Sequence, residues 1–107
     1  MESKKICYIA GPYRAACEWD VIQNIRAAEA VALKYWRMGY IVICPHKNTS
    51  GFSGAMPCET WLSGDIEILK RCDVIVMMSN YLTSEGAKAE LQEAVRAGLE
   101  VIYETDL

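Results

Sequence analysis

The sequence predicts a single α/β domain over residues 1–107, folded as a flavodoxin-like three-layer sandwich with a four-stranded parallel sheet of order 2-1-3-4. Four short apolar runs, rich in β-branched and aromatic residues, are continuous rather than alternating, which is typical of strands buried on both faces. These runs are 6–10, 40–44, 74–78 and 101–103. Longer segments with helical periodicity separate them, and this alternation favours a parallel sheet with right-handed crossovers.

Three segments have the three-and-four spacing of amphipathic helices. They are 20–38, 59–71 and 84–97. Asp20 and Ser84 are the expected N-caps of the first and third helices, and Gly39 and Gly98 are the expected stops.

Each predicted helix has one apolar face. The inward positions are Ile22, Ile25, Ala28, Ala32 and Tyr35 in the first helix, Trp61, Leu62, Ile66 and Leu69 in the second, and Ala87, Leu91, Ala94 and Val95 in the third. The segment 47–58, rich in Gly, Ser, Thr and Asn, is expected to be a long loop, and such loops are usually functional or mobile.

Composition limits the partners of the chain. With 107 residues, a net charge of −3 and scattered Lys and Arg, the sequence lacks the basic clusters that bind nucleic acid. A domain this small buries a modest share of its surface, so a homodimer or higher homo-oligomer is expected. The first apolar run is too short for a signal peptide or a membrane span, so no membrane partner is expected.

The five cysteines are odd in number and form no CxxC pair. This usage indicates reduced thiols and a cytoplasmic setting. With one histidine and no zinc-type spacing, neither a metal site nor another cofactor is expected.

In an open parallel sheet, ligands bind beyond the carboxyl ends of the strands, where the strand order reverses. The segments expected to line that place are 11–14, 45–49 and 79–86. His46 and Arg14 lie in them: His46 is a site residue or a packed one, and Arg14 binds an anion or is solvated.

Two carboxylates border apolar helix faces. Glu90 lies between Ala87 and Ala94, and Asp65 lies four residues after Trp61. Burying a carboxylate costs several kcal/mol unless it is paired or hydrogen-bonded, so such positions are enriched in functional groups. The alternatives are a solvated Glu90 and a capping or salt-bridged Asp65.

The start of the third predicted helix is suited to an anion. Its first turn offers free backbone N–H groups and the positive end of the helix dipole. Ser84 adds a hydroxyl there, and Gly86 allows close approach of a ligand to the backbone.

Three short motifs lie at or near the ends of the predicted strands and helices. The strongest is Ser-Glu-Gly-Ala-Lys-Ala-Glu-Leu at 84–91, with Ala94 after it. The second is Asp65, shortly before the Asp73-Val74 strand start, and the third is Tyr-Ile-Ala-Gly-Pro-Tyr-Arg at 8–14. Together they resemble the nucleoside 2-deoxyribosyltransferase superfamily, which includes 2′-deoxynucleoside 5′-monophosphate N-hydrolases and small phage and bacterial members of unassigned function.

The resemblance implies catalytic roles for three residues: Glu90 as the nucleophile, Asp65 as its assistant at the sugar and base, and Tyr8 as the support of Glu90. It implies a nucleotide or nucleoside substrate and N-glycosidic cleavage of a 2′-deoxynucleoside 5′-monophosphate. The substrate-binding residues that it implies are Gly11, Tyr13, Arg14, His46, Ser84 and Gly86.

Other readings stay open. The resemblance is also compatible with base exchange on free nucleosides, and NAD-type glycohydrolysis is a more distant possibility without a clear dinucleotide signature. A nucleotide-binding module without turnover is a third class, because Glu85 places a negative charge in the proposed phosphate turn.

Overall fold

The computed structural model describes residues 4–104, whose strands form one parallel sheet. The strands are β1 (Ile6–Ala10), β2 (Ile41–Ile43), β3 (Val74–Met77) and β4 (Glu100–Tyr103), in the order β2-β1-β3-β4. Strand β1 pairs with both β2 and β3. The predicted order 2-1-3-4 is therefore confirmed, and the strand bounds differ from the predicted ones by one residue at most at either end.

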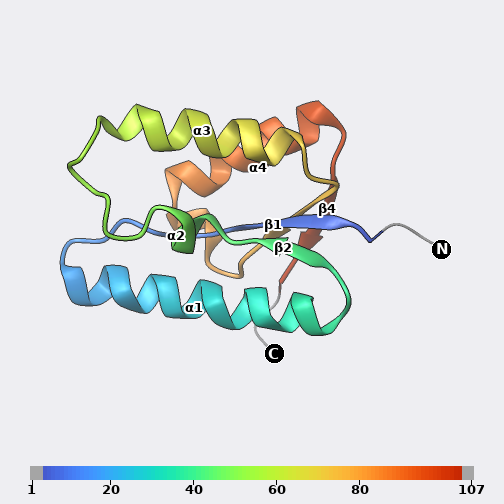
Figure 1. Cartoon of the computed structure of the whole chain (residues 1–107), viewed down its shortest axis with the longest axis horizontal. Helices are drawn as coiled ribbons and strands as arrows, with labels where there is room; N and C mark the ends of the chain where they lie inside the picture. The colour runs from blue at the N-terminus through green and yellow to red at the C-terminus, as the bar shows by residue number, and fades with distance from the viewer. Residues whose placement is uncertain (1–3, 105–107) are drawn as a thin grey trace.

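Helices cover both faces of the sheet (Figure 1). Helix α1 (Glu18–Arg37) lies on one face, and α3 (Cys58–Lys70) and α4 (Glu85–Ala97) lie on the other. A short helix α2 (Pro45–Asn48) follows β2, and a 3-10 turn η1 (Tyr81–Thr83) precedes α4. This is the three-layer α/β sandwich that the sequence predicts.

Side chains of β1 alternate between two core clusters. Cys7 and Ile9 pack on the α1 side, whereas Tyr8 and Ala10 pack on the side of α3 and α4. All four are essentially fully buried. The alternation follows from the two-residue period of a strand, and it points the Tyr8 ring at the helix pair.

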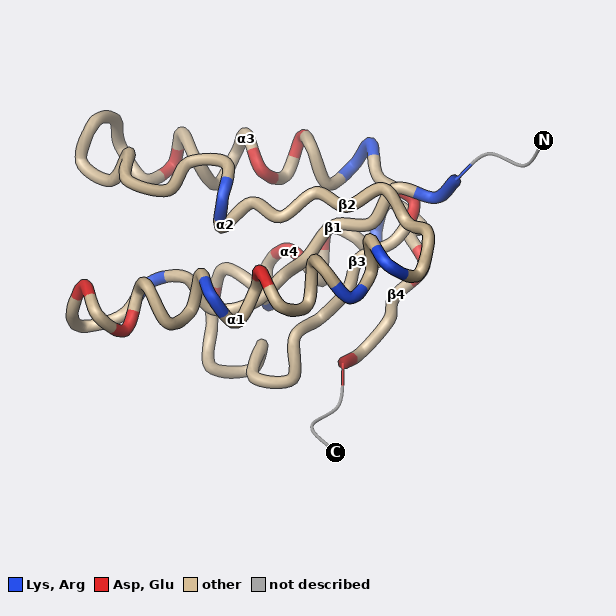
Figure 2. Tube along the Cα trace, turned by 60° about the horizontal axis from the view of Figure 1, so that its bottom comes forward, with Lys and Arg blue, Asp and Glu red and all other residues tan. Residues whose placement is uncertain are grey.

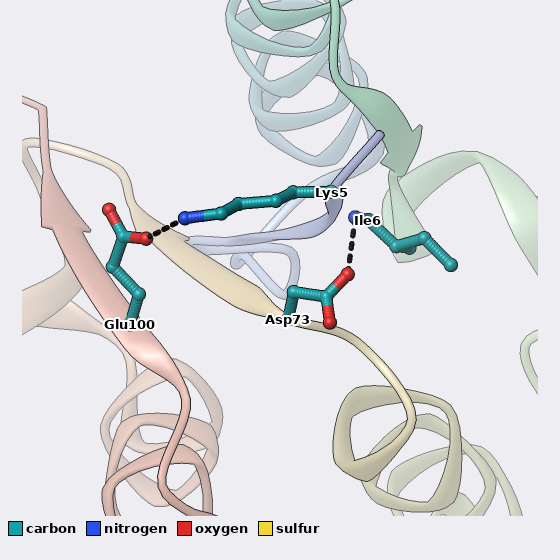
Figure 3. Close-up of polar contacts among 4 residues, drawn as sticks. All are labelled: Lys5, Ile6, Asp73 and Glu100. Carbon is teal, nitrogen blue, oxygen red and sulfur yellow. Dashed lines mark hydrogen bonds and ion pairs between the residues drawn. The ribbon is translucent and has the colours of Figure 1, made fainter. Parts of the chain in front are cut away.

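Polar contacts lock the amino edge of the sheet, away from the carboxyl ends of the strands (Figure 3). The backbone N–H of Ile6 donates to Asp73 Oδ2 at 2.8 Å, and Lys5 Nζ lies 2.9 Å from Glu100 Oε1. Asp73 thus links the start of β1 to the segment before β3.

Charged residues of both signs are interspersed along the helices (Figure 2).

The helix ends agree with the prediction except at the start of α1. Ser84 caps α4 through its side chain, and Gly39 and Gly98 have the positive φ expected of helix stops. The prediction of Asp20 as an N-cap is wrong, because α1 begins at Glu18 and its N-cap residue is Cys17. Asp20 lies in the first turn, where its charge complements the helix dipole.

Two side-chain predictions and one loop prediction also need correction. Val95 is 61% exposed, because α4 packs on the sheet through the face that holds Ala87, Leu91 and Ala94. Leu62 is 45% exposed and lies at the edge of the inward face of α3. The predicted loop 47–58 loses its first residues to α2, since Pro45 supplies the fixed φ favoured in the first turn of a helix.

Candidate active site

A hydrogen bond joins the central strand to α4. The Tyr8 hydroxyl donates to Glu90 Oε2. Burial raises the pKa of Glu90 to about 7, the negative charge of Asp65 adds to the rise, and the Tyr8 hydrogen bond opposes it. Burial, followed by the nearby charge of Glu90, raises the pKa of Tyr8 far above its ordinary value, so Tyr8 stays a protonated donor.

Asp65 lies on α3, which packs directly against α4. Burial raises the pKa of Asp65 to about 6. Its charge also raises the pKa values of both Glu90 and Tyr8. The structure therefore brings Tyr8, Asp65 and Glu90 into one electrostatic unit, and the solvated alternative for Glu90 does not hold.

The start of α4, the helix that carries Glu90, has backbone N–H groups that are not used within the helix. Ser84 Oγ accepts from the N–H of Ala87 at 3.1 Å, and the N–H of Lys88 donates to the Ser84 carbonyl at 3.1 Å. The two earlier amides of the helix, those of Glu85 and Gly86, are left without an intrahelical acceptor. The Ser84 O–H is also still able to donate, because the cap uses only a lone pair of its oxygen.

The first turn of α4 has an ion pair on its exposed side and an apolar side chain near Gly86. Glu85 is almost fully exposed and lies 2.9 Å from Lys88 Nζ, so its charge is partly compensated. A methyl group built on Gly86 would lie 3.9 Å from Leu62 Cδ2. Leu62 thus forms the apolar side of the turn.

Gly11 follows β1 where the backbone passes close to β3. A Cβ atom at this position would lie 2.3 Å from Met78 Sδ, and Met78 is buried. The absence of a side chain at Gly11 therefore sets the path of the turn that leads to Tyr13 and Arg14.

His46 fastens the same turn from α2. Its Nε2 lies 2.8 Å from the Pro12 carbonyl oxygen, which can only accept, so Nε2 carries the proton. Burial lowers the pKa of His46, and Nδ1 is buried without a partner among the described residues. A neutral imidazole of this tautomer can accept a hydrogen bond from a hydroxyl or water at Nδ1, but it does not attract phosphate by charge.

Tyr13 packs edge-on against His46, with ring centroids 5.9 Å apart, and its carbonyl accepts from Asn24 Nδ2 at 3.1 Å. Arg14 is exposed. The structure therefore gathers Gly11, Tyr13 and His46 around one turn, while Arg14 extends from it into solvent.

The sequence prediction missed several contributors. Asn24 and Met78 support the turn, yet neither belongs to a motif. A groove of about 960 Å³ lies beside α1 and β2, at the edge of the sheet, and not over the carboxylates. No group of three or more His, Cys, Asp or Glu side chains in the described part could hold a metal ion.

Comparisons with known proteins agree with this architecture. A solved structure of a 2-deoxyribosyltransferase from the psychrotolerant bacterium Bacillus psychrosaccharolyticus is similar, with a TM-score of 0.65 and 21% sequence identity. The match covers 92% of this chain and 70% of that one. The predicted resemblance to the deoxyribosyltransferase superfamily is thereby confirmed for the fold.

No curated protein matches the chain. Among the described residues, no helix is both long and apolar enough to cross a membrane. A family model described as "Domain of unknown function (DUF4406)" matches residues 5–103. Because this match spans almost the whole sequence, the chain belongs to the DUF4406 family.

Proposed function

We propose that the protein cleaves the N-glycosidic bond of a 2′-deoxynucleoside 5′-monophosphate, with Glu90 as nucleophile. The observation that supports this most is the partly buried Glu90 carboxyl, which accepts a hydrogen bond from Tyr8 and lies near the charge of Asp65. A carboxylate in such surroundings is suited to trap an oxocarbenium-like centre, as retaining glycosidases do.

In the first step, Glu90 Oε1 attacks C1′ while the bond between C1′ and the base nitrogen breaks. Tyr8 holds Oε2, which leaves Oε1 free to form the ester. The electron pair of the broken bond stays on the base, which takes a proton from Asp65 or from water. Water then attacks C1′ of the ester and gives a proton to the Asp65 carboxylate, which releases 2-deoxyribose 5-phosphate and restores the Glu90 carboxylate.

The phosphate is assigned to the start of α4. The Ser84 hydroxyl and the Gly86 amide are available donors there, and the helix dipole favours an anion. Arg14 supplies the positive charge by folding back from its exposed position. His46 and Gly11 act by shaping the turn that leads to Tyr13 and Arg14.

Transfer of deoxyribose between bases is the second candidate. It is supported by the structural likeness to a protein described as a 2-deoxyribosyltransferase. In that reaction a second base, instead of water, attacks C1′ of the ester. Adding a free base that differs from the leaving base would then yield a new nucleoside or nucleotide.

The decisive experiment incubates the protein with a panel of deoxynucleotides and measures free base by chromatography. Base release by the wild type and its loss in Glu90→Ala, with nucleotide binding largely kept, is the expected result. Glu93→Ala is the matched control, because Glu93 lies on the same helix and pairs with Arg96 at 2.8 Å outside the site. Unchanged release by Glu90→Ala would refute the assignment of the nucleophile.

Calorimetry on the same panel separates catalysis from binding. Tight binding of a nucleotide by the wild type without release of base would favour a nucleotide-binding module.

The five cysteines are all unpaired. Free thiols support the proposal that the protein works in the reducing cytoplasm.

A further inference from the structure

Helix α1 carries a second row of residues besides the face that packs on the sheet. The face toward the sheet holds the buried Ala28, Ala32 and Tyr35. The second row, here called the α1 seam, consists of six residues spaced alternately by three and four: Trp19, Ile22, Arg26, Glu29, Leu33 and Trp36. This spacing is the a/d repeat of a helix that packs along another helix.

The apolar members of the seam are poorly covered within one chain. Trp19 is 65% exposed, Leu33 is 48% exposed and Trp36 is 51% exposed. Ile22 is only partly buried. Large aromatic and aliphatic side chains in a row on one helix mark an interaction surface more often than scattered single exposures do.

The chemical order of the seam is the same from either end. It is tryptophan, aliphatic, charged, charged with the opposite sign, aliphatic, tryptophan. If two α1 helices lie antiparallel, with a two-fold axis midway between Arg26 and Glu29, each residue meets its counterpart. Trp19 then faces Trp36 of the second copy, Ile22 faces its Leu33, and Arg26 faces its Glu29.

We propose that the α1 seam is the interface of a homodimer in which the two α1 helices pack antiparallel. A two-fold interface must be self-complementary, and the seam meets that condition in both size and charge. A parallel arrangement would set Arg26 against Arg26 and Glu29 against Glu29. The charged pair thus selects the antiparallel register, which is the role that such pairs commonly have at helix interfaces.

The surroundings of the seam leave room for the second helix. Arg26, Glu29, Leu33 and Trp36 also line the groove of about 960 Å³ beside α1. Residues of β2 and α2 and Ile68 of α3 line the same groove. Glu29 lies 3.3 Å from Lys47, but both side chains are about half exposed, so Glu29 remains accessible to an arginine from the second copy. This inference is independent of the proposed catalytic activity.

Sedimentation equilibrium with the full chain tests the proposal. The expected mass is twice the 12.0 kDa of one chain at about 0.1 mM, a concentration at which a specific interface of standard size is populated. Arg26→Glu and Glu29→Arg should each weaken the dimer about tenfold or more, because each places like charges together twice. The double variant Arg26→Glu/Glu29→Arg should restore it, since the pairs reform with their signs exchanged.

Two further variants locate the interface. Trp36→Glu should give a folded monomer, as judged by far-ultraviolet circular dichroism. Val95→Glu is the matched control and should stay dimeric, because Val95 is 61% exposed on α4, far along the chain from the seam. A monomeric wild type would overturn the proposal. A dimer that survives both Arg26→Glu and Trp36→Glu, or a charge exchange that restores nothing, would also overturn it.

Discussion

The Tyr8 hydroxyl of the central strand donates a hydrogen bond to the carboxylate of Glu90 on α4, across 82 positions of the sequence. This contact joins the central strand to the residue that we propose as the nucleophile. The parallel sheet buries Tyr8 completely, and the small residues of α4 bring Glu90 down to it. Burial and Asp65 raise the pKa of Glu90, the hydrogen bond lowers it, and the balance is a pKa of about 7.

Replacement of Tyr8, which donates the hydrogen bond to Glu90, should change the pKa of Glu90 and leave the fold intact. In Tyr8→Phe the stabilisation of the carboxylate is lost, so the pKa of Glu90 should rise above about 7. The loss of rate should therefore be larger at pH 7, where Glu90 must first lose its proton to attack, than at pH 9. Tyr40→Phe is the control, because Tyr40 packs in the core on the α1 side of the sheet. Equal losses at both pH values would contradict the role of Tyr8.

The pH profile of kcat/KM should be bell-shaped. With a pKa of about 7 for Glu90 and about 6 for Asp65, the pair holds one proton between about pH 6 and 7. Catalysis requires the singly protonated pair in the form with Asp65 protonated and Glu90 ionised. Because Glu90 has the higher pKa, this is the minor form, and it is most populated in the same pH window. Asp65→Asn should remove the alkaline fall, so that the rate rises to a plateau with the pKa of Glu90, which should lie below about 7 because the charge of Asp65 no longer raises it. A wild-type plateau above pH 7 would contradict the acid role and favour Asp65 as a holder of the sugar.

Glu90→Gln should stabilise the protein at high pH. Glu90 has a pKa of about 7 when folded, against 4.5 ordinarily, so the folded state binds its proton more tightly. Wild-type stability should therefore fall as the pH rises from about 4.5 to about 7 and then level off. The gain from Glu90→Gln should be small near pH 4.5 and on the order of 3 kcal/mol at pH 8. Urea unfolding at both pH values measures it, with Glu93→Gln as control. A gain that does not depend on pH would contradict this account.

The fold was predictable because the strands and helices are locally consistent. Continuous apolar runs, and stops such as Gly39 and Gly98, define the elements without knowledge of their packing. Details that depend on packing were missed. Val95 belongs to the apolar pattern of α4 yet is exposed, because the face of α4 that packs on the sheet is the one with Ala87, Leu91 and Ala94.

The candidate site was only partly predictable. Periodicity marked Asp65 and Glu90 as unusual, but their roles came from the resemblance of the motifs. The supporting contacts of Pro12 with His46, and of Asn24 with Tyr13, join residues 34 and 11 positions apart and follow no motif spacing. The α1 seam is the opposite case. Its spacing can be read from the sequence, but only the structure shows that α1 packs on the sheet through a different face and leaves the seam exposed.

Ser84→Asp should discriminate between phosphorylated and free substrates. Aspartate is as good an N-cap as serine, so the start of α4 should keep its geometry and stability. Its negative charge, however, would stand where the phosphate is expected. KM for a deoxynucleotide should rise at least tenfold, which corresponds to about 1.4 kcal/mol, while KM for the matching deoxynucleoside should not rise. Equal effects on both substrates would argue against a phosphate site at this turn.

Gly11→Ala should cost stability through one identifiable contact. The new methyl carbon would lie 2.3 Å from Met78 Sδ, so the buried Met78 side chain must move. Forcing an extra methyl group into a packed core costs about 1–3 kcal/mol. Met78→Ala alone should also destabilise, because it leaves a cavity. The double variant Gly11→Ala/Met78→Ala should be less destabilised than the sum of the two single variants, since the methyl group then occupies space that the methionine has vacated. Urea unfolding of the four proteins measures this coupling, and simple additivity would show that Met78 is not what excludes a side chain at position 11.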